Sequence, residues 1–431
     1  MSHARQISKR YLVRFLGALM LLGPAKASLL HEEATSRALH QKSLDAYVQQ
    51  LKELEIWEDV QLFSQQEKGD VSQQAYALPV TTIKDEACPK AEATEILKEY
   101  SRTLKSLQKK IALCQKIEDS LTNGALRPLQ GLVLIAQGDE PLFYDMRGTR
   151  GGLHLDAPFL IASLSKQVTA ALVLRVRGAD GKKLNVHEPI KTYFPKATDT
   201  WMSCVSLHHM LTHTSGIKAV GESLLFEPGS QFNYSNEVYD LVGTILEMVT
   251  GQSYNQLVQD LFAQVGMKDS LAPDWDILTE CPCVTGYFEA LEGNVHVCEV
   301  VRATKSNPSS GLVSTARDLL KWNRVLHTGK LLSDKRYKAM CTPFSNREKD
   351  TGYGYGVQIH DHEEGKEVSH NGIAPGYLST LKYVTKKEVS IIVLENCILL
   401  VNRCKESAQE NMFEFQDQIS ALVQRDPYWQ S

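Results

Sequence analysis

The apolar run from Val168 to Val176 constrains the fold of this chain more than any other stretch of its sequence. It holds no acidic residue, and neither Pro nor Gly follows until Gly178. A helix that is apolar on nearly all sides is buried on nearly all sides, so we expect a central core helix here. Ser163 and Lys166 come just before this run, three residues apart, and therefore share one helical face.

Ser163 and Lys166 at the start of such a helix have the chemistry of an activated nucleophile. The serine hydroxyl would lie near unpaired backbone N–H groups and the positive end of the helix dipole. An amine in poorly hydrated surroundings has a lowered pKa, and a neutral amine can accept the serine proton. The same Ser-x-x-Lys spacing begins at Ser106, Ser215 and Ser379, but only Ser163 opens an apolar helix.

Length and composition indicate a globular protein with more than one structural unit. The 431 residues are 43% hydrophobic and 23% charged, and the net charge is −4. This balance does not favour nucleic acid or an anionic membrane as a partner. No apolar stretch after the first thirty residues is long enough to span a bilayer.

Residues 1–27 have the pattern of a signal peptide. Basic residues without any acid accompany an apolar run from Phe15 to Leu22, and Ala25-Lys-Ala27 follows. We therefore predict cleavage after Ala27 and an exported protein, periplasmic or secreted. An ordinary N-terminal helix and a mitochondrial presequence are the alternatives, because an acid-free, arginine-bearing segment fits the latter as well.

Nine cysteines follow this segment, and an odd number leaves at least one unpaired thiol or an intermolecular bridge. Cys281-Pro-Cys283 is too closely spaced for the usual zinc motif, and we predict neither a metal nor a cofactor. Loop disulfides from this pair to Cys298, or from Cys397 to Cys404, are open alternatives because connectivity cannot be deduced from sequence.

Residues 28–127 predict a helical N-terminal extension. Segments 37–66 and 92–121 have helical patterns, and residues 67–90 form a linker between them. We expect the second helix to pack on a neighbouring surface, and self-association or a protein partner through both helices is the alternative. The second helix has an apolar stripe and, opposite it, a face rich in Lys and Glu. The stripe contains Leu97, Tyr100, Leu104, Leu107, Ile111 and Cys114.

Residues 128–425 predict one α/β (α+β) domain whose sheet is built from both ends of its sequence. Strand patterns at 131–136 and 141–144 are separated by a turn, which indicates a hairpin. Tight connections between the later strands favour an antiparallel sheet, which helices would cover, with a helical lobe inserted. Those later strands are expected at 367–372, 377–384 and 388–394, and the helices at 207–216, 237–250, 254–265, 315–327 and 412–423.

Tyr234-Ser-Asn236, the only Tyr-x-Asn of the chain, offers further groups for acyl transfer. A phenol beside a lysine ammonium is expected to lose its proton more easily, so Tyr234 together with Lys166 would deprotonate Ser163. Asn236 offers an amide to Lys166 and to a substrate carbonyl. The alternative is a turn in which Asn236 caps the following helix.

His-x-Gly occurs twice, and the context separates the two copies. His327 ends an amphipathic helix, where a structural role is favoured. His370-Asn-Gly372 lies on a predicted strand, so its imidazole is expected to line a groove beside the sheet. Gly372 would let substrate approach the backbone, and the N–H groups of Ile373 and Ser163 would form an oxyanion hole.

Three motifs in this order resemble those of the serine β-lactamase and penicillin-binding protein superfamily: Ser163-Leu-Ser-Lys166, Tyr234-Ser-Asn236 and His370-Asn371-Gly372. The sequence is most similar to class C β-lactamases and the related D-alanyl-D-alanine carboxypeptidases and esterases. The resemblance implies a β-lactamase/transpeptidase-like fold, an antiparallel sheet flanked by helices with an inserted all-helical lobe. Framework similarities, within residues 128–425, are Leu211–Ile217, Phe226–Ser230, Gly311–Leu319 and Pro375–Tyr377.

The resemblance also implies roles for the motif residues. Ser163 would form the acyl-enzyme, with Lys166 and Tyr234 handling protons. Many relatives carry a lysine, a fixed cation for a substrate carboxylate, where this chain has His370, which is largely neutral near pH 7. We therefore expect a serine hydrolase for peptides, including D-amino-acid cell-wall stems, or esters. A class C-type β-lactamase and a non-catalytic scaffold are the alternatives. The expected substrate-binding residues are Asn236, His370, Asn371 and Gly372.

Overall fold

The structure, a computed structural model, divides into two compact units, Leu121–Gln424 and the combination of Met1–Ser120 with Arg425–Ser431. The predicted signal peptide and, except for Lys90, the predicted linker lie outside the described residues, as do Cys88, Cys281 and Cys404. Within the described residues, no helix combines the length and the apolar character that crossing a membrane requires. The described residues are 36–53, 90–124, 129–148, 152–178, 181, 183–219, 221–273, 283–289, 294–298, 307–348, 351–362, 365–399, 413–426 and 428.

The smaller unit contains the two helices predicted for the N-terminal extension. They are α2 (Ser36–Glu53) and α4 (Lys90–Asp119). The rings of Tyr47 and Tyr100 lie 6.2 Å apart between their centroids, so one contact between the helices is aromatic. Residues 54–66 of the first predicted helix lie outside the described residues.

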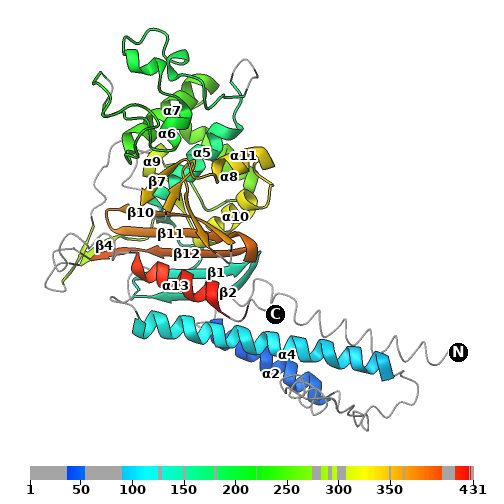
Figure 1. The fold of residues 1–431 in the computed structure, drawn as a ribbon. Coiled ribbons are helices and arrows are strands. Elements are labelled where there is room, and N and C mark those ends of the chain that lie inside the picture. The colour runs from blue at the N-terminus through cyan, green and yellow to red at the C-terminus, as the bar shows by residue number, and fades with distance from the viewer. Residues whose placement is uncertain are drawn as a thin grey trace. The chain divides into compact units, whose positions relative to one another are not determined.

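The larger unit is organised around an eight-stranded antiparallel sheet with the order β2-β1-β12-β11-β10-β9-β8-β7 (Figure 1). The N-terminal hairpin pairs with the last long strand, and Gly131 opposes Glu395 in that ladder. The predicted sheet built from both ends of the domain is therefore confirmed. Its strands are β1 (Gly131–Gln137), β2 (Glu140–Arg147), β7 (Ser345–Glu348), β8 (Thr351–Tyr353), β9 (Gln358–His362), β10 (Gly365–Ala374), β11 (Tyr377–Val384) and β12 (Val389–Glu395).

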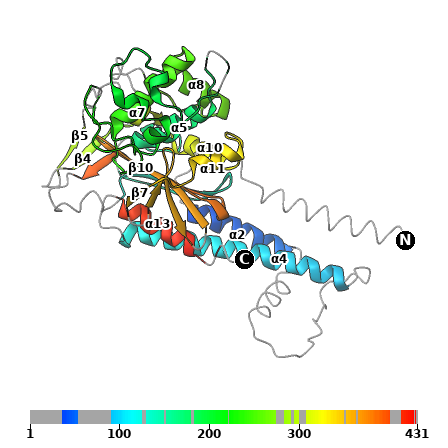
Figure 2. The same ribbon diagram turned by 45° about the horizontal axis from the view of Figure 1, so that its top comes forward.

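Helices lie on both faces of this sheet (Figures 1 and 2). On one face, Asn323 of α10 donates hydrogen bonds to the Lys382 carbonyl and to Ser390 Oγ. On the other face lies α13, whose Asp417 accepts a hydrogen bond from Lys382 Nζ at 2.6 Å. The helices of this unit are α5 (Ser165–Arg175), α6 (Leu207–Leu211), α7 (Asn236–Thr250), α8 (Tyr254–Val265), α9 (Asn307–Ser310), α10 (Ala316–His327), α11 (Asp334–Met340) and α13 (Glu414–Arg425).

Several short elements have no counterpart in the sequence prediction. Strands β7, β8 and β9 extend the sheet beyond β10, although their segments are short and rich in polar residues. Period-two alternation is hard to recognise in three to five residues, so the sequence did not predict these strands. Two small sheets were also not predicted, one of β3 (Phe159–Leu160) and β6 (Val313–Ser314), the other of β4 (Tyr287–Glu289), β5 (Val295–Val297) and β13 (Cys397–Leu399).

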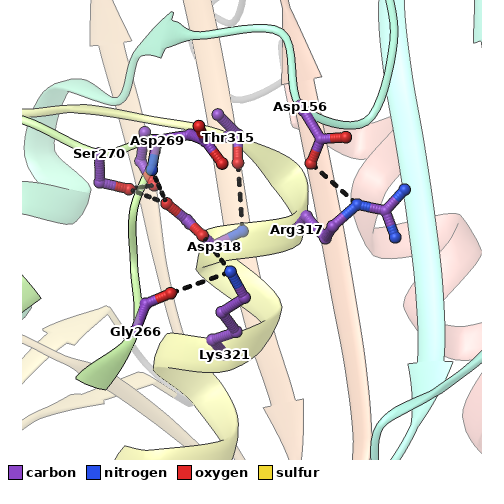
Figure 3. A network of polar contacts seen from close by, with 9 residues as sticks. Asp156, Gly266, Asp269, Ser270, Thr315, Arg317, Asp318 and Lys321 are labelled. Carbon is purple, nitrogen blue, oxygen red and sulfur yellow. Dashed lines mark hydrogen bonds and ion pairs between the residues drawn. The ribbon is translucent and has the colours of Figure 1, made fainter. Parts of the chain in front are cut away.

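A buried carboxylate fixes the start of α10 (Figure 3). Asp318 accepts hydrogen bonds from the Asp269 N–H and the Ser270 hydroxyl, each at 2.8 Å, and from Lys321 Nζ at 2.7 Å. Thr315 caps the helix by accepting from the Asp318 N–H at 3.1 Å. The network therefore ties α10 to the segment that follows α8.

Candidate active site

Ser163 lies in a short 3₁₀ turn, Ala162–Leu164, that leads directly into α5. Every residue of α5 from Ser165 to Leu174 is buried, which confirms the predicted core helix. Ala162, just before Ser163, has a φ of 48°, a left-handed conformation that costs energy for a residue other than glycine. The neighbouring Ile161 holds this turn in place by accepting a hydrogen bond from Ser379 Oγ at 2.7 Å.

Lys166 is fully buried, and its amine contacts three oxygen atoms. Its Nζ lies 3.1 Å from Ser163 Oγ, 2.7 Å from Asn236 Oδ1 and 2.8 Å from the Ser309 carbonyl oxygen. Burial lowers the pKa of Lys166 to about 7, although Asp240 acts in the opposite direction. The predicted lowering of the Lys166 pKa is confirmed. A neutral amine has two N–H donors and one lone pair, which matches two carbonyl-type acceptors and one hydroxyl.

Tyr234 contacts the nucleophile from a second direction. Its hydroxyl donates a hydrogen bond to Ser163 Oγ at 2.9 Å. The expectation that its proton is easily lost is wrong, because burial raises the pKa of Tyr234 to about 12, more than the hydrogen bond to Ser163 lowers it. The phenol therefore keeps its proton at neutral pH and donates a hydrogen bond to Ser163.

Asn236 is the first residue of α7 and is not its cap. Ser235 occupies the N-cap position, and its hydroxyl accepts from the Val238 N–H. This arrangement leaves the exposed Asn236 side chain available to Lys166, and the alternative of a capping role is wrong.

His370 does not line an open groove. Its side chain is fully buried on β10, where Nε2 lies 2.9 Å from the Tyr353 hydroxyl and Nδ1 lies 2.6 Å from the Asn371 carbonyl oxygen. Burial holds the pKa of His370 well below its ordinary value, and the positive charges of Lys166 and Arg347 lower it further. The prediction of direct substrate contact is not supported, because the ring is neutral and both of its nitrogens are engaged within the protein.

Gly372 marks the closest approach of β10 to the nucleophile turn. A Cβ at this position would lie 2.4 Å from Ser379 Oγ and 2.7 Å from the Ile161 carbonyl oxygen, so only glycine fits. The neighbouring Ile373 is 43% exposed. Asn371 accepts a hydrogen bond from Thr380 through its side chain, which engages its amide with β11.

Sequence reasoning missed several groups that surround the three motifs. The Ser309 carbonyl binds Lys166, and the Ser309 N–H donates to Asp240 at 3.2 Å. Asp240 lies four residues after Asn236, so its place on the same face of α7 was available from helical spacing. The ring of His213 lies 4.2 Å from that of Tyr234 between centroids, and its Nδ1 accepts from the Ser235 N–H. These contacts fix the position of the phenol.

Comparison with known proteins gives one family for most of this unit. A model of the beta-lactamase family matches residues 124–398. Penicillin-binding protein 4* of Bacillus subtilis is 24% identical over 333 residues, 64% of this chain and 70% of that protein. A D-aminopeptidase of Brucella anthropi is 24% identical over 286 residues, 59% of this chain, and the match spans only 52% of its length.

A solved structure has the same fold. The penicillin-binding protein of Bacillus halodurans superposes with a TM-score of 0.58 at 22% identity, over 72% of this chain and 99% of that one. The predicted antiparallel sheet flanked by helices is thus confirmed.

Proposed function

This chain belongs to the beta-lactamase family, and from that premise we propose that it is a serine hydrolase that forms an acyl-enzyme at Ser163. The observation that carries the proposal is the pair of contacts on Ser163 Oγ, with Lys166 Nζ at 3.1 Å and the Tyr234 hydroxyl at 2.9 Å. A serine beside a neutral amine and a proton donor has the groups that acyl transfer requires.

In this mechanism Lys166 is the general base. When the neutral amine donates its two N–H bonds to Asn236 Oδ1 and the Ser309 carbonyl, its lone pair is left for the Ser163 proton. Ser163 Oγ then attacks a carbonyl carbon, and the bond to the leaving group breaks. Tyr234 gives its proton to the leaving atom and recovers one from the Lys166 ammonium, which restores both groups.

The N–H groups of Ser163 and Ile373 are our proposed oxyanion hole. The tight packing of Gly372 against the Ile161 carbonyl supports this assignment, because it brings the strand that carries Ile373 next to the turn that carries Ser163. Water would then attack the acyl-enzyme, with Lys166 accepting its proton.

We propose peptides or esters as the substrate class, including peptides that contain D-amino acids. A relative is named as a D-aminopeptidase, which supports an amide substrate. The scaffold alternative is less favoured because the buried lysine and the serine are in hydrogen-bonding contact, an arrangement that a scaffold does not need.

Active-site labelling tests the proposal. A fluorophosphonate should label the wild-type protein, whereas Ser163→Ala should not react and Lys166→Met should react at least about a hundredfold more slowly. Ser230→Ala, at an exposed serine, is the control and should be labelled like the wild type. An unlabelled wild-type protein would contradict the hydrolase and favour the scaffold, and rapid hydrolysis of nitrocefin would favour the β-lactamase.

A further inference from the structure

His213 holds the chain on both sides of Tyr234, in a segment without regular secondary structure. It lies in the turn after α6, and its carbonyl oxygen accepts a hydrogen bond from the Asn233 N–H at 2.7 Å. Its Nδ1 accepts another from the Ser235 N–H at 3.2 Å. Between these two bonds, the ring of His213 lies 4.2 Å from the ring of Tyr234, centroid to centroid. One residue thus fixes the backbone before and after Tyr234 and supports the phenol.

The conformation of His213 costs stability. Its φ is 57°, in the left-handed region that is unfavourable for residues with a Cβ. The residue is 1% exposed, and its Nε2 has no hydrogen-bond partner among the described residues. Backbone strain of this kind is concentrated at active sites, where it serves the mechanism. The cost at His213 therefore indicates a function in the neighbouring site.

The imidazole of His213 is neutral and carries its single N–H at Nε2. Because Nδ1 accepts from the Ser235 N–H, it holds no proton. Burial keeps the pKa of His213 well below its ordinary value, and the positive charge of Lys166 lowers it further. The hydrogen bond to Ser235 therefore persists through the pH range in which Lys166 changes its charge.

We propose that His213 is the positioning residue for the proton transfer from Tyr234 to the leaving atom, an inference that rests on the proposed function. In that mechanism the phenol serves the leaving group, whereas Lys166 serves the nucleophile Ser163. Lys166 has its own contact with Asn236 Oδ1, at 2.7 Å. Displacement of the phenol should therefore slow the departure of leaving groups that need a proton and spare those that depart as stable anions.

Two esters of N-acetyl-D-alanine that differ only in the leaving group test this role. The 4-nitrophenolate departs without a proton, whereas ethoxide requires one. His213→Gly removes the ring and accommodates the positive φ. It should lower kcat/KM for the ethyl ester at least about tenfold more than for the 4-nitrophenyl ester. His213→Asn should recover most of this loss, because asparagine tolerates the φ and its Oδ1 can replace Nδ1 as the acceptor for Ser235.

His327→Asn is the matched control, because the ring of His327 also stacks on a tyrosine, Tyr383, at 4.2 Å. This variant should leave the ratio of the two kcat/KM values unchanged. Fluorophosphonate labelling of Ser163 releases fluoride, which departs without a proton. His213→Gly should therefore be labelled at a rate close to that of the wild type, which shows that the variant is folded.

A measurement on the wild type tests the proposal independently of the folding of His213→Gly. In histidine ¹⁵N NMR, with the ring assigned by its loss in His213→Asn, Nδ1 should stay unprotonated and Nε2 protonated from about pH 6 to 9. A ring that titrates in this range, or one with its proton on Nδ1, would overturn the proposal.

Equal losses on both esters in His213→Gly, or a His213→Asn variant as impaired as the glycine variant, would show a merely structural role. A labelled wild type that does not hydrolyse the ethyl ester would also overturn the proposal, because Tyr234 would then not serve the leaving atom. That result leaves Ser163 as the nucleophile, whereas an unlabelled wild type removes the hydrolase and the role of His213 together.

Discussion

At the residue scale, the charge of Lys166 decides when Ser163 can be activated. Its amine is neutral above its pKa of about 7 and protonated below it. Tyr234 keeps its proton across the neutral range, since its pKa is about 12. In the proposed mechanism Lys166 therefore accepts a proton as the general base, and Tyr234 donates one as the general acid.

We predict from these two pKa values that kcat/KM rises with pH through a midpoint near 7. Above the midpoint it reaches a plateau that extends to well above pH 9. Below the midpoint it should fall about tenfold per pH unit, because only the neutral amine acts as base. Asp240→Asn should move the midpoint to lower pH, since the carboxylate of Asp240 raises the pKa of Lys166.

Asp260→Asn, which neutralises an exposed carboxylate on α8, is the control and should leave the midpoint in place. A profile that falls through the neutral range, or one that is flat across pH 7, would contradict the assignment of Lys166 as the base.

Part of this site could be predicted because two of its residues, Ser163 and Lys166, are close together in the sequence. Ser163 and Lys166 share a helical face, so their contact follows from spacing and apolar context alone. The pKa of Tyr234 and the burial of His370 depend on tertiary packing, in which Tyr353 comes from a strand without a clear sequence pattern.

At the element scale, long segments with clear periodicity were predictable. The predicted and observed bounds agree for α8 (Tyr254–Val265) and β11 (Tyr377–Val384). In α8 the apolar residues recur at helical spacing along the whole element, and caps lie at both ends. In β11 all eight residues are buried, and a turn precedes the strand. Strand β7 has the sequence Ser-Asn-Arg-Glu, which carries no apolar period. Such elements form because the adjacent sheet offers unpaired hydrogen-bonding groups.

The buried Asp318 gives a prediction at this scale. Asp318→Asn should destabilise the protein by about 2 kcal/mol, because it removes the charge that accepts from Lys321 and turns amide N–H groups toward other donors. Urea unfolding should show a lower midpoint with an unchanged slope.

Asp156→Asn is the control from the same view (Figure 3), since its ion pair with Arg317 lies partly in solvent. This variant should change stability by less than about 0.5 kcal/mol. An Asp318→Asn variant as stable as its control would show that the network contributes no net stability.

At the scale of the whole molecule, the chemistry lies within one unit. The sheet, the core helix α5 and each residue of the proposed mechanism belong to Leu121–Gln424. The family match at residues 124–398 begins close to the start of this unit, so the preceding helices α2 and α4 lie outside the matched region. The N-terminal extension therefore contributes no residue to the proposed mechanism.

We predict that deletion of residues 28–120 leaves a folded, active hydrolase. The larger unit has its own buried core, which includes Leu172, Val242 and Ile392, and its own set of backbone ladders. Fluorophosphonate labelling of Ser163 and the midpoint of thermal unfolding should both stay close to those of the full chain. The same deletion combined with Ser163→Ala controls for labelling elsewhere. An insoluble product would contradict this prediction and show that the larger unit does not fold without the extension.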